Sequence, residues 1–198
     1  MDKTIRYYDE HADSFAAGTI NVDFSAAQDR FLSFLPKDGR ILDFGCGSGR
    51  DSKYFLAKGF QVDAADGSEK MCRIARQNTG LPVRQMLFSE LDAEAVYDGI
   101  WACASILHLP KSELRNVLLN IAGALKSGGY CYTSFKYGEF EGERNGRHFT
   151  DFTEKTIGNF LTELSKLTIV DEWISSDVRP GRTEEKWLNV IIQKAPDD

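Results

Sequence analysis

The chain has 198 residues, of which 42% are hydrophobic and 12% aromatic, so it can bury one sizeable core but has too few residues for two comfortable domains. Its 24 Lys and Arg residues against 30 Asp and Glu residues give a formal net charge of −6, which argues against a nucleic-acid partner or an anionic membrane surface. The sequence has no run of about 18 apolar residues, so we expect no transmembrane helix and no membrane partner.

Short apolar runs alternate along the chain with segments of helical period. Residues 1–36 have a helical pattern and are expected to cover the ligand-binding end of the fold. Strands are predicted at residues 40–44, 60–65, 82–86, 98–104, 130–135, 168–175 and 186–193. Helices are predicted at residues 50–58, 69–78, 112–126 and around 157–164, with Ser68 and Thr153 as N-caps.

The order of these elements predicts the fold class. Strands separated by single helices are typical of a parallel sheet with helices on both faces. Only a turn at Pro180-Gly181 separates the last two strands, which predicts an antiparallel pair. We therefore expect an α/β, Rossmann-like, doubly wound seven-stranded sheet, mostly parallel with an antiparallel C-terminal edge hairpin. One domain is expected over residues 1–198, with 1–36 as a helical N-terminal lid and 37–198 as the core.

Cysteine usage and the first residues bear on the compartment. The four cysteines, Cys46, Cys72, Cys103 and Cys131, include no Cys-x-x-Cys pair and lie among apolar or small residues. This pattern predicts buried free thiols rather than a zinc site or a disulfide framework. The first ten residues are charged and lack the apolar stretch of a signal peptide. We therefore expect a cytoplasmic protein.

A glycine-rich loop follows the first strand, at the edge of the sheet where ligands bind in such folds. Its glycines are Gly45, Gly47 and Gly49, and Arg50 stands where the dinucleotide-binding fingerprint would need a further glycine. Asp43, at the end of the strand, would repel a pyrophosphate but favour a ligand with an ammonium or sulfonium group. S-adenosylmethionine carries both cations.

A second acidic residue ends the second strand. Asp66 lies 21 residues after Gly45, at a position where a carboxylate can accept hydrogen bonds from both hydroxyls of a ribose. The alternative interpretation is that Asp66-Gly67 is simply a turn and Ser68 a helix cap. Acidic residues at both strand ends separate this predicted pocket from a phosphate-binding loop.

Four segments in this order resemble the motifs of the class I S-adenosylmethionine-dependent methyltransferases. They are Ile41-Leu42-Asp43-Phe44-Gly45-Cys46-Gly47-Ser48-Gly49, the run from Val62 to Met71, the run from Tyr97 through His108-Leu109-Pro110, and Lys126-Ser127-Gly128-Gly129. The resemblance covers residues 5–194, and within the family it is greatest to small bacterial tellurite-resistance-type methyltransferases.

The resemblance implies a set of cofactor-binding residues, with Asp66 at the ribose and Met71 against the adenine. The full set is Tyr8, Phe15, Asp43, Gly45, Cys46, Gly47, Gly49, Asp66, Gly67, Met71, Phe88 and Ala104. The chain departs from the family at Leu87, where an acidic residue often binds the adenine amine. The backbone N–H of Phe88 can still reach an adenine ring nitrogen. Tyr8 and Phe15 would close over the cofactor, although packing against the core also explains them.

Methyl transfer from a sulfonium requires alignment and exclusion of water but no metal and no covalent nucleophile. A base is needed only if the acceptor must lose a proton. By analogy with the fold, the candidate catalytic residues are His108 after the fourth strand, Tyr137, Arg147 and His148 within the polar stretch 136–150, and Arg179 and Arg182 beside the final turn. The two last arginines can clamp an anionic acceptor. The alternatives are a structural His108, a solvated loop at 136–150 and ordinary surface charge at the turn.

These observations predict a methyltransferase that uses S-adenosylmethionine to methylate a small-molecule acceptor. One alternative is a domain that binds the cofactor as a sensor without catalysis, because no acceptor motif is diagnostic. A second is an NAD-dependent oxidoreductase, against which Arg50 and Asp43 argue. The acceptor, the methylated atom and the oligomeric state are left open.

Overall fold

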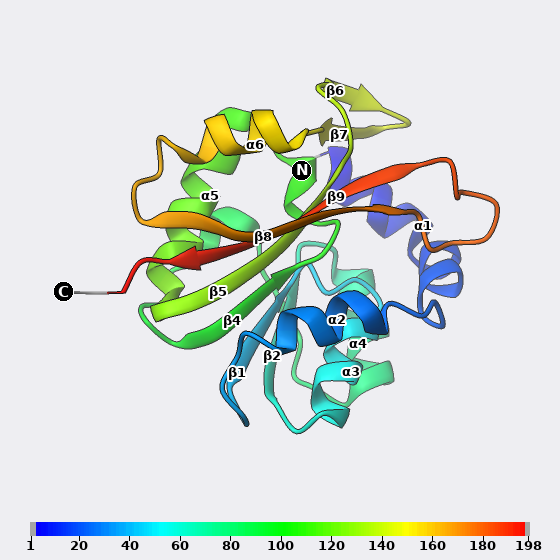
Figure 1. Cartoon of the computed structure of the whole chain (residues 1–198). Coiled ribbons are helices and arrows are strands. Elements are labelled where there is room, and N and C mark those ends of the chain that lie inside the picture. Colours follow the sequence, from blue (N-terminus) through cyan, green and yellow to red (C-terminus); the bar gives the residue numbers. More distant parts are fainter. Residues whose placement is uncertain (1–2, 197–198) are drawn as a thin grey trace.

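The computed structural model describes residues 3–196 and contains a seven-stranded sheet in the order β3-β2-β1-β4-β5-β9-β8 (Figure 1). The strands are β1 (Arg40–Phe44), β2 (Gln61–Asp66), β3 (Arg84–Gln85), β4 (Tyr97–Ala102), β5 (Leu125–Lys136), β8 (Leu167–Ser176) and β9 (Lys186–Lys194). β1 to β5 pair in parallel, whereas β9 pairs antiparallel with both β5 and β8. The predicted fold class is confirmed.

Helices cover both faces of the sheet (Figure 1). They are α1 (Lys3–Thr19), α2 (Ser25–Leu32), α3 (Arg50–Ala57), α4 (Glu69–Thr79), α5 (Lys111–Ala124) and α6 (Glu154–Leu161). Leu42 and Phe44 of β1 pack in the same apolar cluster as α5 and α6, whereas Ile41 packs with α2 and α3. Because side chains alternate along a strand, this buried alternation places a helix layer on each side of β1.

The predicted N-terminal lid divides into two parts. Phe31 of α2 is fully buried against Phe55 of α3 and Trp101 of β4, so α2 belongs to one of the core layers. α1 instead contacts α4 and a two-stranded hairpin of β6 (Glu141–Arg144) and β7 (Arg147–Thr150). Of these two helices, α1 is therefore the one that lies over the end of the sheet (Figure 1).

The hairpin is the largest difference from the predicted elements. No strand was predicted within residues 136–150, and one interpretation of that stretch was a solvated loop. Its two strands turn at Asn145-Gly146, and both residues have a positive φ, of 50° and 76°. Asn-Gly is the dipeptide that two-residue hairpin turns favour, since both central residues must adopt that conformation. The sequence thus contained the signal for this hairpin.

Two element boundaries were predicted wrongly. α5 ends at Ala124 rather than near residue 126, and β5 begins at once with Leu125. The glycines expected to stop the helix lie within the first part of β5, where the pairing with β4 shifts register. Gly128 has a φ of +72°, which suits a local irregularity in the strand. The third strand has only two residues.

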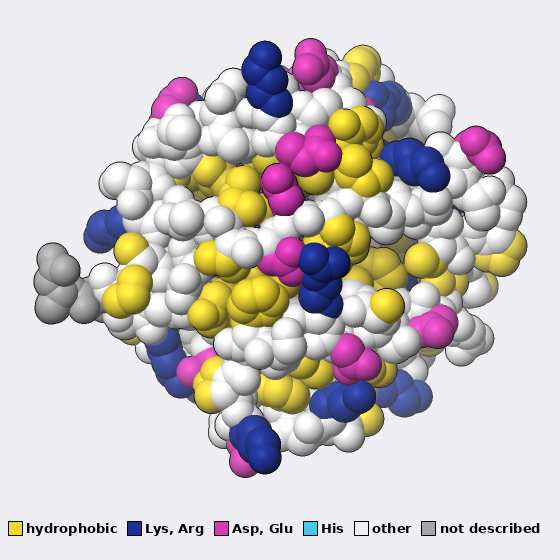
Figure 2. Space-filling model, in the orientation of Figure 1, with side chains coloured by type: hydrophobic (Ala, Val, Ile, Leu, Met, Phe, Trp, Pro, Cys, Tyr) yellow, Lys and Arg dark blue, Asp and Glu magenta, His cyan; other side chains and the backbone are white. Residues whose placement is uncertain are grey.

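No helix within residues 3–196 has the length and apolarity needed to cross a bilayer. On the face seen in Figure 2, basic and acidic side chains are interspersed with apolar ones rather than gathered by sign. This mixture agrees with the acidic but modest net charge of the sequence.

Candidate active site

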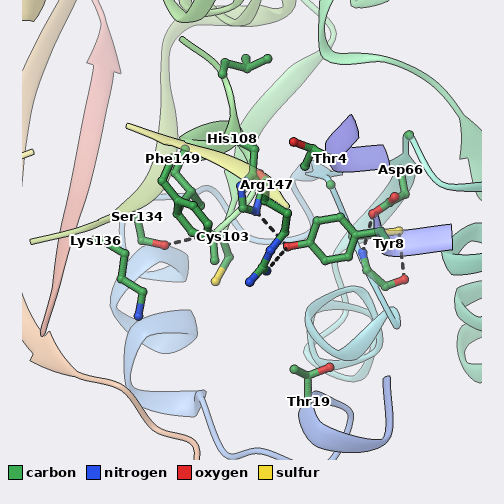
Figure 3. Close-up of a pocket in the computed structure, with 18 of the residues that line it drawn as sticks. Thr4, Tyr8, Thr19, Asp66, Cys103, His108, Ser134, Lys136, Arg147 and Phe149 are labelled. Carbon is green, nitrogen blue, oxygen red and sulfur yellow. Dashed lines mark hydrogen bonds between the residues drawn. The ribbon is translucent and has the colours of Figure 1, made fainter. Parts of the chain in front are cut away.

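A cavity of about 1100 Å³ lies at the carboxyl ends of the central strands. It is lined by the glycine loop, the end of β2 and the residues after β4, together with α1, β7 and the ends of β8 and β9. Figure 3 shows several of these side chains. Parallel strands separated by helices place their carboxyl ends at one edge, which is where ligands bind in such folds. The cavity therefore lies where the sequence predicted it.

The glycine loop is held to β2 by its own backbone. The N–H groups of Gly45 and Cys46 both donate to the carbonyl of Ala65, at 2.8 and 3.0 Å. The N–H of Gly47 donates to Oδ2 of Asp66 at 2.9 Å. A phosphate-binding loop would need such donors to point at its ligand. Because these three are already used within the protein, the loop is better suited to form a wall than to bind a diphosphate.

Asp66 is held rigidly at the end of β2 and lines the cavity (Figure 3). In addition to Gly47, the N–H of Ser68 donates to its Oδ1 at 2.9 Å. Burial raises the pKa of Asp66, and these two backbone donors oppose the rise. A carboxylate has about four acceptor positions, so two backbone hydrogen bonds leave it able to accept from two ligand hydroxyls.

The Asp43 carboxyl group, contrary to expectation, lies behind the loop and outside the cavity wall. It is almost completely buried and accepts a hydrogen bond from Ser52 Oγ at 2.5 Å. Burial and the nearby carboxylate of Asp51 raise the pKa of Asp43 to about 8. The cause is strand alternation, since Asp43 shares the face of Ile41, which points toward α3.

Two other predicted residues lie outside the wall. Gly49 has a φ of +77°, and a Cβ there would sit 2.7 Å from Cγ2 of Thr79, so its role is to let α3 and α4 approach. His148 contributes its backbone carbonyl, which is 2.7 Å from Nδ1 of His108. The other predicted residues line the cavity, namely Tyr8, Phe15, Gly45, Cys46, Gly47, Asp66, Gly67, Met71, Phe88, Ala104, His108, Tyr137, Arg147, Arg179 and Arg182.

The adenine end of the predicted site is apolar. Met71 is fully buried, and the ring of Phe88 packs edge-on against Phe44, with 4.9 Å between the ring centres. Leu87 is partly exposed, and its N–H donates to Glu90 Oε2 at 2.8 Å. The acidic side chain of this segment is therefore Glu90, which binds its own turn.

A hydrogen-bonded group lies across the cavity from this end. Tyr8 comes from α1, His108 follows β4 and Arg147 begins β7 (Figure 3). A carbonyl can only accept, so Nδ1 of His108 carries the proton that it shares with His148. In a neutral imidazole, Nε2 is then the acceptor, and it receives the hydroxyl of Tyr8 at 2.8 Å. Nη1 of Arg147 donates to the same Tyr8 oxygen at 3.2 Å.

This arrangement sets the electrostatics of Tyr8. Burial raises the pKa of the phenol, and the Arg147 guanidinium opposes the rise. Phe15 packs edge-on against the Tyr8 ring at 5.1 Å. Tyr8 is therefore fixed by contacts on both its ring and its hydroxyl.

The two arginines of the final hairpin are already paired. Arg179 donates through its backbone N–H, Nε and Nη2 to Asp177, and Arg182 lies 3.8 Å from Glu185. Burial opposes ionisation of Asp177, but the hydrogen bonds from Arg179 and Trp187 hold its pKa well below the usual value. These contacts correspond to the alternative interpretation of the turn, in which its charges neutralise one another.

Several wall residues were not among the predicted ones, namely Arg50, Asp51, Cys103, Ser134, Lys136, Trp187 and Asn189. Ser134 and Lys136 lie near the carboxyl end of β5. The strand-end argument that identified Asp66 on β2 would have found them as well. Arg50 and Asp51 form an ion pair, with Nε 2.7 Å from Oδ1, and nothing in the sequence pattern distinguished them from an ordinary first helical turn.

Comparisons with known proteins agree with this geometry. Residues 41–129 match the family described as a methyltransferase domain. The match begins in β1 and ends in β5, so it includes the glycine loop and Asp66. This segment of the chain is therefore similar to a methyltransferase domain.

Two curated relatives match part of the chain. The chain is 32% identical over 117 residues to YqeM of Bacillus subtilis, whose name describes a methyltransferase, covering 53% of this chain and 47% of that one. It is 29% identical over 152 residues to human glycine N-methyltransferase, covering 61% and 52%. The chain thus spans about half the length of these relatives.

A solved methyltransferase has the same fold as nearly the whole chain. The 1,6-didemethyltoxoflavin-N1-methyltransferase of Burkholderia thailandensis, solved with 1,6-didemethyltoxoflavin and S-adenosylhomocysteine, superposes with a TM-score of 0.76. The superposition covers 96% of this chain and 85% of that one at 24% identity. At this identity the likeness is one of fold.

Proposed function

We propose that the protein is an S-adenosylmethionine-dependent methyltransferase that acts on a small molecule enclosed in the cavity. The observation that carries the proposal is the state of Asp66, whose carboxylate is fixed by two backbone N–H groups and still lines the cavity. Its remaining acceptor positions suit a ribose, and the apolar surface of Met71 and Phe88 suits an adenine. A volume of about 1100 Å³ holds a nucleoside cofactor together with a small acceptor.

When bound, the cofactor supplies an electrophilic methyl group on a sulfonium. The residues of the chain hold and orient the reactants and exclude water. Asp66 binds the ribose, while α1 covers the cavity with Tyr8 and Phe15 and so limits the access of solvent. Where the acceptor must lose a proton, the Tyr8 oxygen and His108 Nε2 form a pair that can hold it.

Calorimetry with S-adenosylhomocysteine tests the cofactor assignment. Asp66→Ala is expected to lower the affinity at least about 100-fold, since it removes a charged acceptor from buried hydrogen bonds. Asp63→Ala is the matched control, because Asp63 lies on the same strand but pairs with Arg40 outside the cavity. Unchanged affinity in Asp66→Ala would contradict the proposal.

Two alternatives are separated by simple assays. A fluorescence titration with NADH tests the oxidoreductase alternative. Arg50 disfavours this alternative, and so do the N–H groups of the glycine loop, which already donate hydrogen bonds within the protein. Labelled cofactor incubated with thiols, phenols, amines and metalloid oxyanions tests the sensor, which would transfer nothing. Within the methyltransferase class, the tellurite-resistance type, the single-domain organisation and the cytoplasmic location stay predictions from the sequence.

A further inference from the structure

Arg147 has an unusual environment for a basic side chain in a cavity wall. Nη1 donates to Tyr8, whereas Nε is buried without any hydrogen-bond partner. The guanidinium carbon lies 4.5 Å from the ring centre of Tyr7, 5.6 Å from that of Tyr8 and 5.1 Å from that of Phe149. Aromatic faces attract a cation but accept no conventional hydrogen bond from it. Within residues 3–196, Arg147 forms no ion pair.

The other half-buried basic residues of this wall all have acidic partners, whereas Arg182 and Lys186 are exposed. The pairs are Arg50 with Asp51, Arg144 with Asp151, Arg179 with Asp177, and Lys136 with both Asp177 and Glu185. These charges cancel within the protein. Among the described residues, Arg147 is therefore the half-buried basic residue of this wall whose charge is left for a ligand to neutralise.

The position of Arg147 separates it from the predicted cofactor end. In Figure 3, Tyr8 lies between Arg147 and Asp66. Cys103, Ser134 and Lys136 lie on the Arg147 side. An anion beside Arg147 would thus be placed in the acceptor part of the cavity, with Tyr8 between it and the ribose site.

We infer that Arg147 binds a carboxylate of the methyl acceptor, so that the acceptor is a small carboxylic acid. The inference rests on the proposed function, because it assigns the second half of the same cavity. A guanidinium is planar, remains charged and presents paired donors that match a carboxylate. The inference replaces Arg179 and Arg182, which pair with acidic residues of their own hairpin, as the predicted binders of an anionic acceptor. Arg147 on β7 takes this role instead.

Binding measurements on the protein saturated with S-adenosylhomocysteine test this inference without knowledge of the true acceptor. The probes are acetate, benzoate and 4-hydroxybenzoate, each compared with its amide, together with inorganic phosphate. Carboxylates are expected to bind at least about tenfold more tightly than their amides, because only the acid pairs with the charge of Arg147. Arg147→Gln should abolish this preference, and Arg147→Lys should retain part of it.

Arg6→Gln is the matched control. Arg6 is exposed on α1, two residues from Tyr8, and does not line the cavity, so its removal should leave the preference for acids unchanged. Thermal melts establish that each variant is folded, and Arg147→Lys keeps the test valid if Arg147→Gln does not fold.

Three results would overturn the inference. The first is the lack of any preference for acids over amides, whether both bind equally or no probe carboxylate binds at all. The second is binding of phosphate alone, which would assign a different anion. The third is a tenfold or greater loss of S-adenosylhomocysteine affinity in Arg147→Gln, which would mean that Arg147 binds the carboxylate of the cofactor. If the unaltered protein fails to bind S-adenosylhomocysteine, the proposed function fails, and titration of the free protein still decides whether Arg147 binds carboxylates.

Discussion

Two glycines of the same loop should respond differently to alanine. Gly45 has a φ of +87°, and a Cβ there would lie 2.4 Å from Cβ of Ser105. A left-handed backbone conformation costs a non-glycine residue about 1–2 kcal/mol. Relief of such an overlap inside a packed core costs about 1–3 kcal/mol more. We therefore expect Gly45→Ala to lower the free energy of unfolding by about 2–5 kcal/mol.

Gly47 is different because a Cβ there would meet its neighbours only at ordinary van der Waals distances. Its φ is +55°, and the atoms nearest to a Cβ at this position would be Cε of Met71 at 3.7 Å and Cε1 of Phe15 at 3.9 Å. Gly47→Ala should therefore lose only the backbone term of about 1–2 kcal/mol. The new methyl group would occupy cavity space between Met71 and Phe15, both of which line the site. We expect the affinity for S-adenosylhomocysteine to fall about tenfold or more.

Urea unfolding of the ligand-free proteins and calorimetry with S-adenosylhomocysteine measure the two effects separately. The expected pattern is a larger stability loss in Gly45→Ala than in Gly47→Ala, together with weakened binding in a well-folded Gly47→Ala. The reasoning would be refuted by equal stability losses in the two variants. Unchanged ligand affinity in Gly47→Ala would equally show that the loop does not face the cofactor.

Three further predictions concern groups around the site. Asp51→Ala should lower the free energy of unfolding by about 3–5 kcal/mol in urea, because it leaves the largely buried Arg50 without its counter-charge; a loss below about 1 kcal/mol would contradict the pairing. The folded Asp43 carboxyl, with its pKa of about 8, keeps a proton that the unfolded chain has lost. The contribution of this proton to the free energy of unfolding is therefore complete below about pH 4 and is lost as the pH rises to about 8. The loss is at most about 1.4 kcal/mol per pH unit. Asp43→Asn should flatten this dependence in unfolding curves across that range, and an unchanged slope would be contrary evidence. Ser68→Ala removes an N-cap that also donates to a carboxylate on α1. The variant should lower the free energy of unfolding by about 1 kcal/mol and speed hydrogen exchange in α1. The cap variant Thr153→Ala is the control and should leave exchange in α1 unchanged.

The order of strands and helices, the glycine loop and Asp66 were all readable from the sequence. Each depends on residues close together in the chain, namely the apolar period of a strand, the turn that ends it and the acid at its carboxyl end. Even the missed hairpin had a local signal in Asn145-Gly146. The β5 boundary was misplaced because pairing with β4 extends the strand through glycines that otherwise stop a helix.

The tertiary structure alone decided which charged side chains are available to a ligand. Asp43 turned toward α3 and Arg179 toward Asp177, while Arg147 was left without an acid. Whether a charge is neutralised depends on partners brought together by packing, and two opposite charges attract each other more strongly in a low-dielectric wall than in water. Secondary structure follows from neighbours along the chain, whereas the chemistry of this cavity follows from neighbours in space.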